Sequence, residues 1–375
     1  INFNDASQTK RIILSAWESG TNISSYIDSK GFIWRRYNTD GTVDPSYQAT
    51  GYLINAPFAA VGTLHGTIET GYIQDDPEIS LDTAAITHLG DFNPISTAVG
   101  AKNAAQYMCK LSNGQYITSR AINQTTTKDT LYVLHNSDFS AASAMTITNG
   151  GHGASFSVEE SDGTTYIWAS TCVDTASKSY AISRFPYVAG ATLAANDSRI
   201  THYCTVGKYC RVSADLKHGY VLCGYSDGTQ DILKLSDVQA GNYNVLYTFN
   251  ITNYGFEIAK QTYQSQCLDF PYVYWHSGNV DMSDNRMLYA VNVVHKGQEF
   301  AMNYLLDMGL KMVDVAQEPE TCNILYGSDD SRKLLITFNC EDAKGTETER
   351  VFTIPINVRP AAAQLNTAVM ADNDE

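Results

Sequence analysis

Charged residues are scarce in this 375-residue sequence, and basic residues are the scarcer kind. Lysine and arginine together number 25 against 40 aspartate and glutamate residues, so the formal net charge is -15 at pH 7. Binding the phosphates of a nucleic acid would need a basic face, which this balance does not favour. The composition therefore predicts that nucleic acid is not a partner.

Long apolar runs and metal-ligand spacings are missing as well. No stretch approaches the roughly 20 apolar residues that a membrane helix needs, so we expect no membrane insertion. The sequence contains no CxxC pair and no His-x-x-x-His spacing, so a structural zinc site has no support. We expect neither a metal nor another cofactor.

Disulfides are not favoured, although the sequence has eight cysteines. Most of them stand inside apolar runs, as Cys223 does in the stretch 220–224, where a thiol usually behaves as a small buried hydrophobe. Free thiols suit synthesis in a reducing cytoplasm.

The residues that are plentiful favour β-structure. There are 24 tyrosines and 13 phenylalanines, which combine with valine, isoleucine and threonine in short runs broken by glycine, asparagine and aspartate. Long helical periodicity is nearly absent. The clearest expected strands cover residues 115–118, 131–134, 166–169, 220–223, 272–275 and 334–338.

One unit recurs along the chain and predicts the architecture. A polar residue opens a short apolar stretch, a turn follows, and a second aromatic-rich or aliphatic strand comes next. The spacings between successive openers are 46, 59, 55 and 54 residues, which suit one four-stranded propeller blade each. The openers are Gln106, His152, Arg211, Gln266 and Glu320. We therefore predict an all-β protein with a five-bladed β-propeller over 96–357. A β-sandwich is the rival, but it predicts no such recurrence.

Two segments lie outside the repeats. Residues 1–95 are expected to form a small β-rich N-terminal region. It could be an accessory region, whereas a role in attachment is implied only by the family resemblance given below. Residues 358–375 are rich in alanine with an acidic end, and are expected to form an extended C-terminal tail.

Three stretches resemble phage receptor-binding and teichoic-acid-associated five-bladed β-propellers, to which helveticin-like bacteriocins are similar. They are 150–156, 264–278 with its Gln-Ser-Gln start, and the Glu-Pro-Glu at 318–320. The resemblance covers roughly the last three quarters of the chain. Arg211 stands where the family commonly has glutamine, while Cys267 and Thr321 replace a glycine after the opener.

The five openers are the candidate ligand-binding residues, because equivalent positions of a propeller form a ring at one end of its channel. Such a ring could equally be structural and hold ordered water. Arg211 could bind a phosphate or carboxylate with its planar fork, or pair with Glu320. Trp275 is a candidate for stacking on a sugar ring, as are Tyr187, Tyr225, Tyr254 and Tyr304, although most aromatics in β-proteins are core.

The resemblance implies a bacteriophage tail protein, located in the virion after synthesis in the host cytoplasm. Its implied partners are a cell-surface polysaccharide or teichoic acid and other tail proteins, with a homo-oligomer expected. A secreted helveticin-like bacteriocin is one alternative. A propeller glycosidase or depolymerase is another, but only Glu320 among the openers is acidic, whereas glycosidases use paired carboxyl groups. We therefore expect binding without catalysis.

Overall fold

The computed structural model of the chain describes residues 79–358 apart from gaps at 102, 175–178, 257–260, 280–285, 295–296, 305–306, 311–315 and 343. Before residue 79 it describes Thr42 and the backbone of seven short strands. The chain forms two compact units, Ile1–Asp76 and Pro77–Glu375. Residues 359–375 of the expected C-terminal tail lie outside the described residues.

The N-terminal unit consists of small antiparallel sheets, as expected for a β-rich region. Its strands are β1 (Thr9–Ile13) paired with β6 (Leu53–Pro57), β2 (Trp17–Glu18) paired with β3 (Thr21–Asn22), and β4 (Phe32–Tyr37) between β5 (Val43–Thr50) and β7 (Thr63–Ile68). Its role in attachment stays a prediction.

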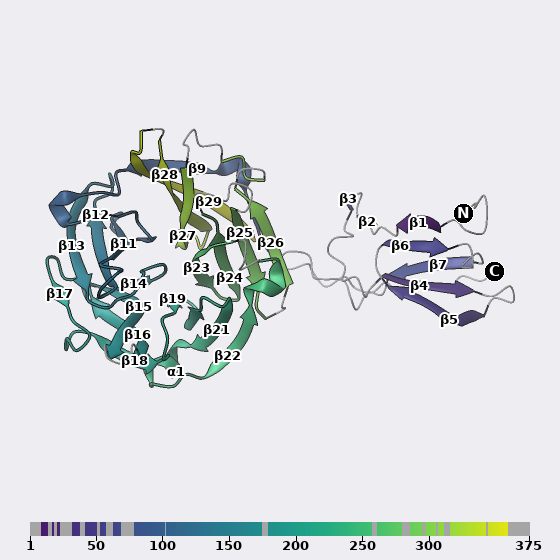
Figure 1. The fold of residues 1–375 in the computed structure, drawn as a ribbon, viewed down its shortest axis with the longest axis horizontal. Helices are drawn as coiled ribbons and strands as arrows, with labels where there is room; N and C mark the ends of the chain where they lie inside the picture. The colour runs from purple at the N-terminus through teal and green to yellow at the C-terminus, as the bar shows by residue number, and fades with distance from the viewer. Residues whose placement is uncertain are drawn as a thin grey trace. The chain divides into compact units, whose positions relative to one another are not determined.

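The second unit is a ring of five sheets, which confirms the predicted five-bladed propeller (Figure 1). Blade one contains β10 (Tyr107–Lys110), β11 (Tyr116–Ile122), β12 (Asp129–His135), β13 (Ala141–Ile147) and the parallel strand β17 (Thr192–Leu193). Blade two contains β14 (Ser157–Ser161), β15 (Thr164–Asp174), β16 (Ser179–Pro186) and β18 (Thr201–Thr205).

Blades three and four follow the same order from the centre outward. Blade three contains β19 (Arg211–Asp215), β20 (Tyr220–Gly224), β21 (Thr229–Lys234) and β22 (Val245–Asn250), with the short helix α1 (Leu235–Gln239) after β21. Blade four contains β23 (Tyr263–Asp269), β24 (Tyr272–Ser277), β25 (Met287–Asn292) and β26 (Gly297–Asn303). Single 3-10 turns occur at Thr83–Ala85, Thr97–Val99 and Ile251–Tyr254.

Blade five closes the ring with strands from both sides of the repeats. It contains β27 (Ala316–Tyr326), β28 (Arg332–Glu341), β29 (Glu347–Val358) and β8 (Ile79–Leu81), and β9 (Thr87–Phe92) also pairs with β29. The predicted boundary at 95/96 is therefore wrong, since the propeller unit begins at Pro77. The physical reason is that β29 needs an outer partner, and the chain before the first repeat provides it.

Local turn chemistry explains why neighbouring strands pair. Asp162 and Gly163, between β14 and β15, have positive φ angles of 52° and 73°. Two successive residues with positive φ are what a tight two-residue hairpin requires, and Asp-Gly is a favoured pair for it.

Five principal apolar clusters fill the spaces between neighbouring blades. They are centred on Tyr132 and Phe156, on Trp168 and Val212, on Leu222 and Trp275, on Tyr274 and Phe338, and on Met108 and Val351. All eight cysteines are buried and free, which confirms the prediction of unpaired thiols. Within the described residues, no helix is long and apolar enough to cross a membrane.

Candidate functional site: the two ends of the central channel

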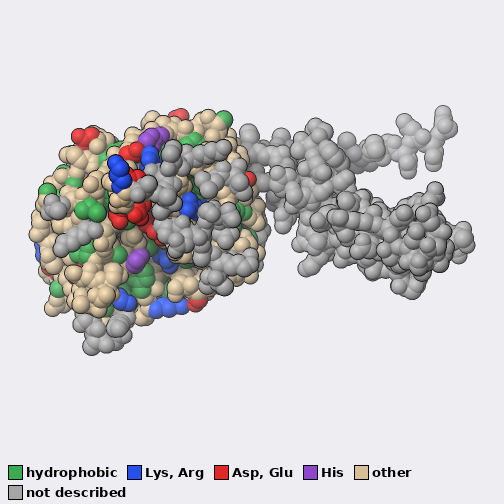
Figure 2. Space-filling view, turned by 45° about the horizontal axis from the view of Figure 1, so that its top comes forward, with side chains coloured by type: hydrophobic (Ala, Val, Ile, Leu, Met, Phe, Trp, Pro, Cys, Tyr) green, Lys and Arg blue, Asp and Glu red, His purple; other side chains and the backbone are tan. Residues whose placement is uncertain are grey.

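The innermost strands are β10, β14, β19, β23 and β27, and the predicted openers lie at or near their starts. Three of the openers retain solvent access, and we call Gln106, His152 and Arg211 the start rim. His152 is exposed, whereas Gln106 and Arg211 are half-buried. Figure 2 shows acidic and basic side chains intermingled on the face it presents, with no broad area of one charge.

A rigid loop presents His152 to solvent. Gly151 and Gly153 on either side have φ angles of 83° and 80°, a region in which other residues are strained. The Gly151 amide donates to the Lys128 carbonyl over 2.8 Å. The Gly153 amide donates to the Tyr209 hydroxyl over 3.1 Å. The loop backbone on both sides of His152 is therefore fixed.

The imidazole of His152 is available to a ligand. Neither ring nitrogen bonds to the part of the protein that the structure describes. Partial burial, followed by the positive charges of Arg211 and Lys128, lowers the pKa of His152 below its ordinary value. The neutral ring that results can both donate and accept a hydrogen bond.

Arg211 ties two blades together rather than presenting a free fork. Its Nε donates to the Gln264 carbonyl over 3.0 Å, and its Nη2 donates to the Tyr263 carbonyl over 2.6 Å. The guanidinium also lies 4.3 Å from the centre of the Tyr263 ring. The alternative of an Arg211–Glu320 ion pair is not found among the described residues. What remains for a ligand is Nη1 and the second N–H of Nη2.

Gln266 is inside the protein and not at the rim. Its side chain is fully buried, its Nε2 donates to the Arg211 carbonyl over 2.9 Å, and its Oε1 accepts from the Tyr263 hydroxyl. β23 starts at Tyr263, three residues before this opener. Gln266 therefore lies in mid-strand, and its amide serves the contact between blades three and four.

Glu320 is buried as well, at a bulge of β27. Burial, followed by the charges of Glu318 and Glu349, raises the pKa of Glu320 well above its usual value. Gln106 makes one long contact with it, 3.5 Å between Nε2 and Oε1. Glu320 thus lies buried between blades one and five, where its surroundings favour the protonated form.

Trp275 belongs to the core. Its ring stacks on Tyr289 with centroids 5.0 Å apart and planes 8° apart, and it is fully buried. Tyr225 and Tyr304 are buried too, while Tyr187 and Tyr254 are half-buried. The structure therefore gives Trp275 no surface on which a sugar ring could stack.

The opposite end of the channel holds a cavity that the sequence reasoning missed. We call it the end cavity; its volume is about 610 Å³. It is lined by residues at or near the ends of β10, β19, β23 and β27, by residues of β14, and by the hairpins that follow some of these strands. Ligand pockets commonly fall in the range of about 300 to 1,000 Å³. The lining includes Lys110, Lys217, Lys333, Ser157, Ser213 and Glu160. The available signal was the polar residue that ends each innermost strand, opposite the openers.

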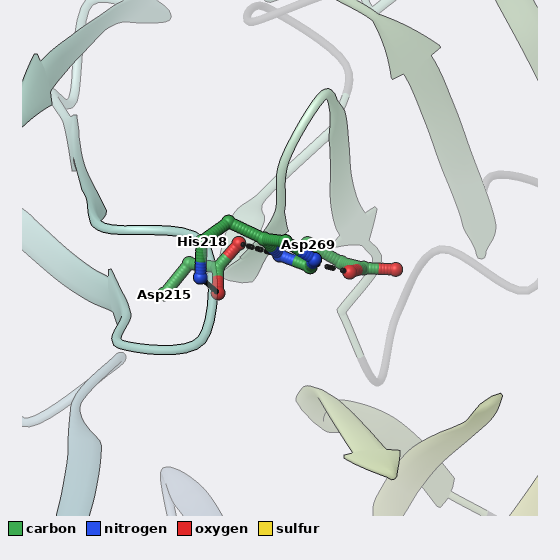
Figure 3. A group of neighbouring side chains, drawn as sticks. All are labelled: Asp215, His218 and Asp269. Atoms are coloured by element: carbon green, nitrogen blue, oxygen red, sulfur yellow. Dashed lines mark hydrogen bonds and ion pairs between the residues drawn. The ribbon is translucent and has the colours of Figure 1, made fainter. Parts of the chain in front are cut away.

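An ionic network lies beside this cavity (Figure 3). His218 Nδ1 is 2.7 Å from Asp215 Oδ2 and 3.7 Å from Asp269 Oδ1. These three side chains have the composition of a metal site. However, Arg332 Nη1 lies 3.0 Å from Asp269 Oδ2, and the Tyr326 hydroxyl donates to Asp269 Oδ1 over 2.7 Å. A cation would have to compete with this guanidinium, so the network fits a structural brace better than a metal centre.

The geometry defines a five-bladed β-propeller with a polar rim at one end of its channel and a cavity at the other. Residues 113–354 match the family described as the phage 5-bladed beta propeller receptor binding platform domain. The match covers more than half of the chain, and the chain belongs to this family.

Two relatives agree with this assignment. The chain is 24% identical over 222 residues to the "Putative major teichoic acid biosynthesis protein C" of Bacillus subtilis strain 168, which covers 56% of this chain and 49% of that protein. The tail fiber of Staphylococcus aureus phage P68 shares the fold with a TM-score of 0.56 and 16% identity, over 72% of this chain and 52% of the fiber. The chain thus spans about half the length of each.

Proposed function

We propose that this chain is part of a phage tail in the virion and binds a glycopolymer of the host cell surface through the start rim. Family membership supports receptor binding. The names of the two relatives, a tail fiber and a teichoic acid biosynthesis protein, support the virion and the polymer respectively.

The observation that carries the proposal is the state of His152. His152 is an exposed residue whose ring has no hydrogen-bond partner among the described residues, and it stands on a loop whose backbone is fixed on both sides. The cations Arg211 and Lys128 are near enough to lower its pKa. Fixing a contact residue in advance reduces the entropy lost on binding, and neighbouring cations favour phosphate or carboxylate groups on the polymer.

Binding without cleavage follows from the state of the acidic groups. Glycosidases use two carboxyl groups that reach the sugar. Here Glu320 and Glu349 are both buried, and burial raises both pKa values. We expect that the protein releases no reducing sugar or phosphate from host envelopes. If it does, and if Glu320→Gln abolishes the release, the proposal of binding without cleavage is wrong.

His152→Ala tests the proposed rim. Binding of the full chain to isolated cell walls of Bacillus subtilis and Staphylococcus aureus is measured by co-sedimentation. We expect a loss of about tenfold or more, equivalent to roughly 1.4 kcal/mol. The matched control is His88→Ala, which removes another exposed histidine, paired with Asp91 on β9. Equal binding by the wild-type chain and His152→Ala, with both folded, would refute the rim as the receptor site.

A further inference from the structure

We propose that the end cavity is a second binding site, and that it takes the phosphate groups of the surface polymer. That the phosphate belongs to the surface polymer rests on the proposed function, whereas the preference of the site for phosphate is inferred from the cavity alone. None of the residues that line the cavity belongs to the start rim, so the two sites share no side chain.

The cavity walls have hydrogen-bond donors left over. The Ser157 hydroxyl oxygen accepts from the Ala214 amide over 2.8 Å, and the Ser213 hydroxyl oxygen accepts from the Leu268 amide over 3.0 Å. Both oxygens are thus used as acceptors in linking neighbouring blades. Their hydroxyl hydrogens have no acceptor in the described part of the protein. Two donors therefore remain in the wall of the cavity.

Two ammonium groups are also available. Lys110 and Lys333 are exposed and form no ion pair with the residues that the structure describes. Lys217 is different, because its Nζ lies 2.8 Å from Asp330 and is largely neutralised. These two ammonium groups outnumber the one carboxylate of the lining, that of Glu160, that forms no ion pair with the described residues.

The carboxylates of the lining already accept hydrogen bonds, although Glu160 keeps its charge. Glu160 is the exposed carboxylate of the cavity, and its two oxygens accept from the amide and the hydroxyl of Ser112 over 2.8 and 3.0 Å. Asp215 is buried and accepts from the Phe270 amide and His218. What the cavity still offers is donors, and the ligand that matches them is an anion with several acceptor oxygens.

The arrangement of the donors favours phosphate over carboxylate. The cations of the lining are three lysines, which act as point charges and do not impose the planar, bidentate geometry of an arginine. Donors that approach from separate strands also suit the tetrahedral oxygens of a phosphodiester.

The test uses the full chain and a synthetic glycerol-phosphate hexamer, with affinity measured by calorimetry. We expect saturable binding that weakens as salt rises from 50 to 500 mM, since exposed charges are screened. The Lys110→Met/Lys333→Met double variant should bind at least tenfold more weakly. Lys344→Met is the matched control, because this exposed lysine lies in the β28–β29 hairpin outside the cavity, and it should bind within twofold of wild type.

Three results would overturn the proposal: no binding of the hexamer, equal binding by the double variant, or equal affinity for a neutral maltohexaose or an oligogalacturonate. If free inorganic phosphate competes as well as the hexamer does, the cavity is a phosphate site but the polymer is not its specific ligand. Cell-wall binding separates the two proposals. Walls that bind the double variant and wild type alike refute only the cavity's role, whereas walls that bind neither refute the proposed function.

Discussion

Asp269 and Arg332 form an ion pair that joins blades four and five, with Oδ2 and Nη1 3.0 Å apart and the aspartate fully buried. Removing the guanidinium leaves the buried carboxylate with only the Tyr326 hydroxyl and His218 as partners among the described residues. Arg332→Met should therefore lower the free energy of unfolding by about 3 kcal/mol, measured by urea denaturation. The control is Lys208→Met, which removes a pair whose side chains are 60% and 58% exposed and should cost under about 1 kcal/mol. Similar losses in both variants would contradict the structural role of the buried pair.

Glu349 should make stability depend on pH. Burial raises the pKa of this carboxyl from 4.5 to about 7, so the folded state keeps a proton that the unfolded state releases. Its contribution is fully present below pH 4.5 and is lost as pH rises through about 7, at a cost of about 3 kcal/mol by pH 8. Glu349→Gln should remove this dependence.

The measurement for Glu349 is the difference in unfolding free energy between wild type and Glu349→Gln from pH 4 to pH 8. The difference is needed because His135 and His276 titrate with the opposite sign, their pKa values being lowered to about 4 and about 3 by burial. A difference that stays constant over this range would show that Glu349 does not hold the proton.

The loop that presents His152 should depend on Gly151. A Cβ at this position would lie 2.4 Å from the Tyr209 ring, in a backbone with a φ of 83°. Gly151→Ala should therefore cost about 2 kcal/mol or more and should weaken cell-wall binding. Gly163→Ala is the matched control, because it has a similar φ of 73° but nothing within 4 Å of its Cβ, and strain alone costs of order 1 kcal/mol. Equal effects of the two variants would show that the Tyr209 contact is unimportant.

Gln266 should matter for stability and not for ligand contact. Gln266→Ala removes its buried hydrogen bonds to the Arg211 carbonyl and the Tyr263 hydroxyl, which should cost about 2 kcal/mol. Thermal unfolding measures this loss, and cell-wall binding of the folded variant should stay within twofold of wild type. If the variant has normal stability but fails to bind cell walls, Gln266 belongs to the receptor site after all.

The propeller should fold from Pro77 but not from Ser96. A chain that starts at Pro77 keeps β8 and β9, which pair with β29. A chain that starts at Ser96 loses them and exposes the edge of blade five, so it should unfold at a lower temperature or aggregate. Calorimetry and light scattering of the two chains decide this. A fully stable chain from Ser96 would show that the closing strands are dispensable.

Sequence patterns predicted the blades because each inner hairpin carries its own signals, such as Asp162-Gly163 and the apolar stretch 220–223. They did not predict the closure of blade five, since β8 pairs with residues far along the chain at Ile356–Val358. They also misplaced Gln266 and Glu320. β23 and β27 begin before these residues. The sequence of one repeat does not show which of its residues the neighbouring blades bury.

The closure of blade five also determines where mechanical load would reach the propeller. The chain before Pro77 leads into β8. Ile79 of this strand pairs with Val358 of blade five, and the Ile79 amide donates to the Glu299 carboxylate of blade four over 3.2 Å. Tension applied through the N-terminal unit would therefore be taken up first by blades four and five. Blades one to three, which include the loop that carries His152, would bear no load until the contacts of β8 with β29 and Glu299 broke.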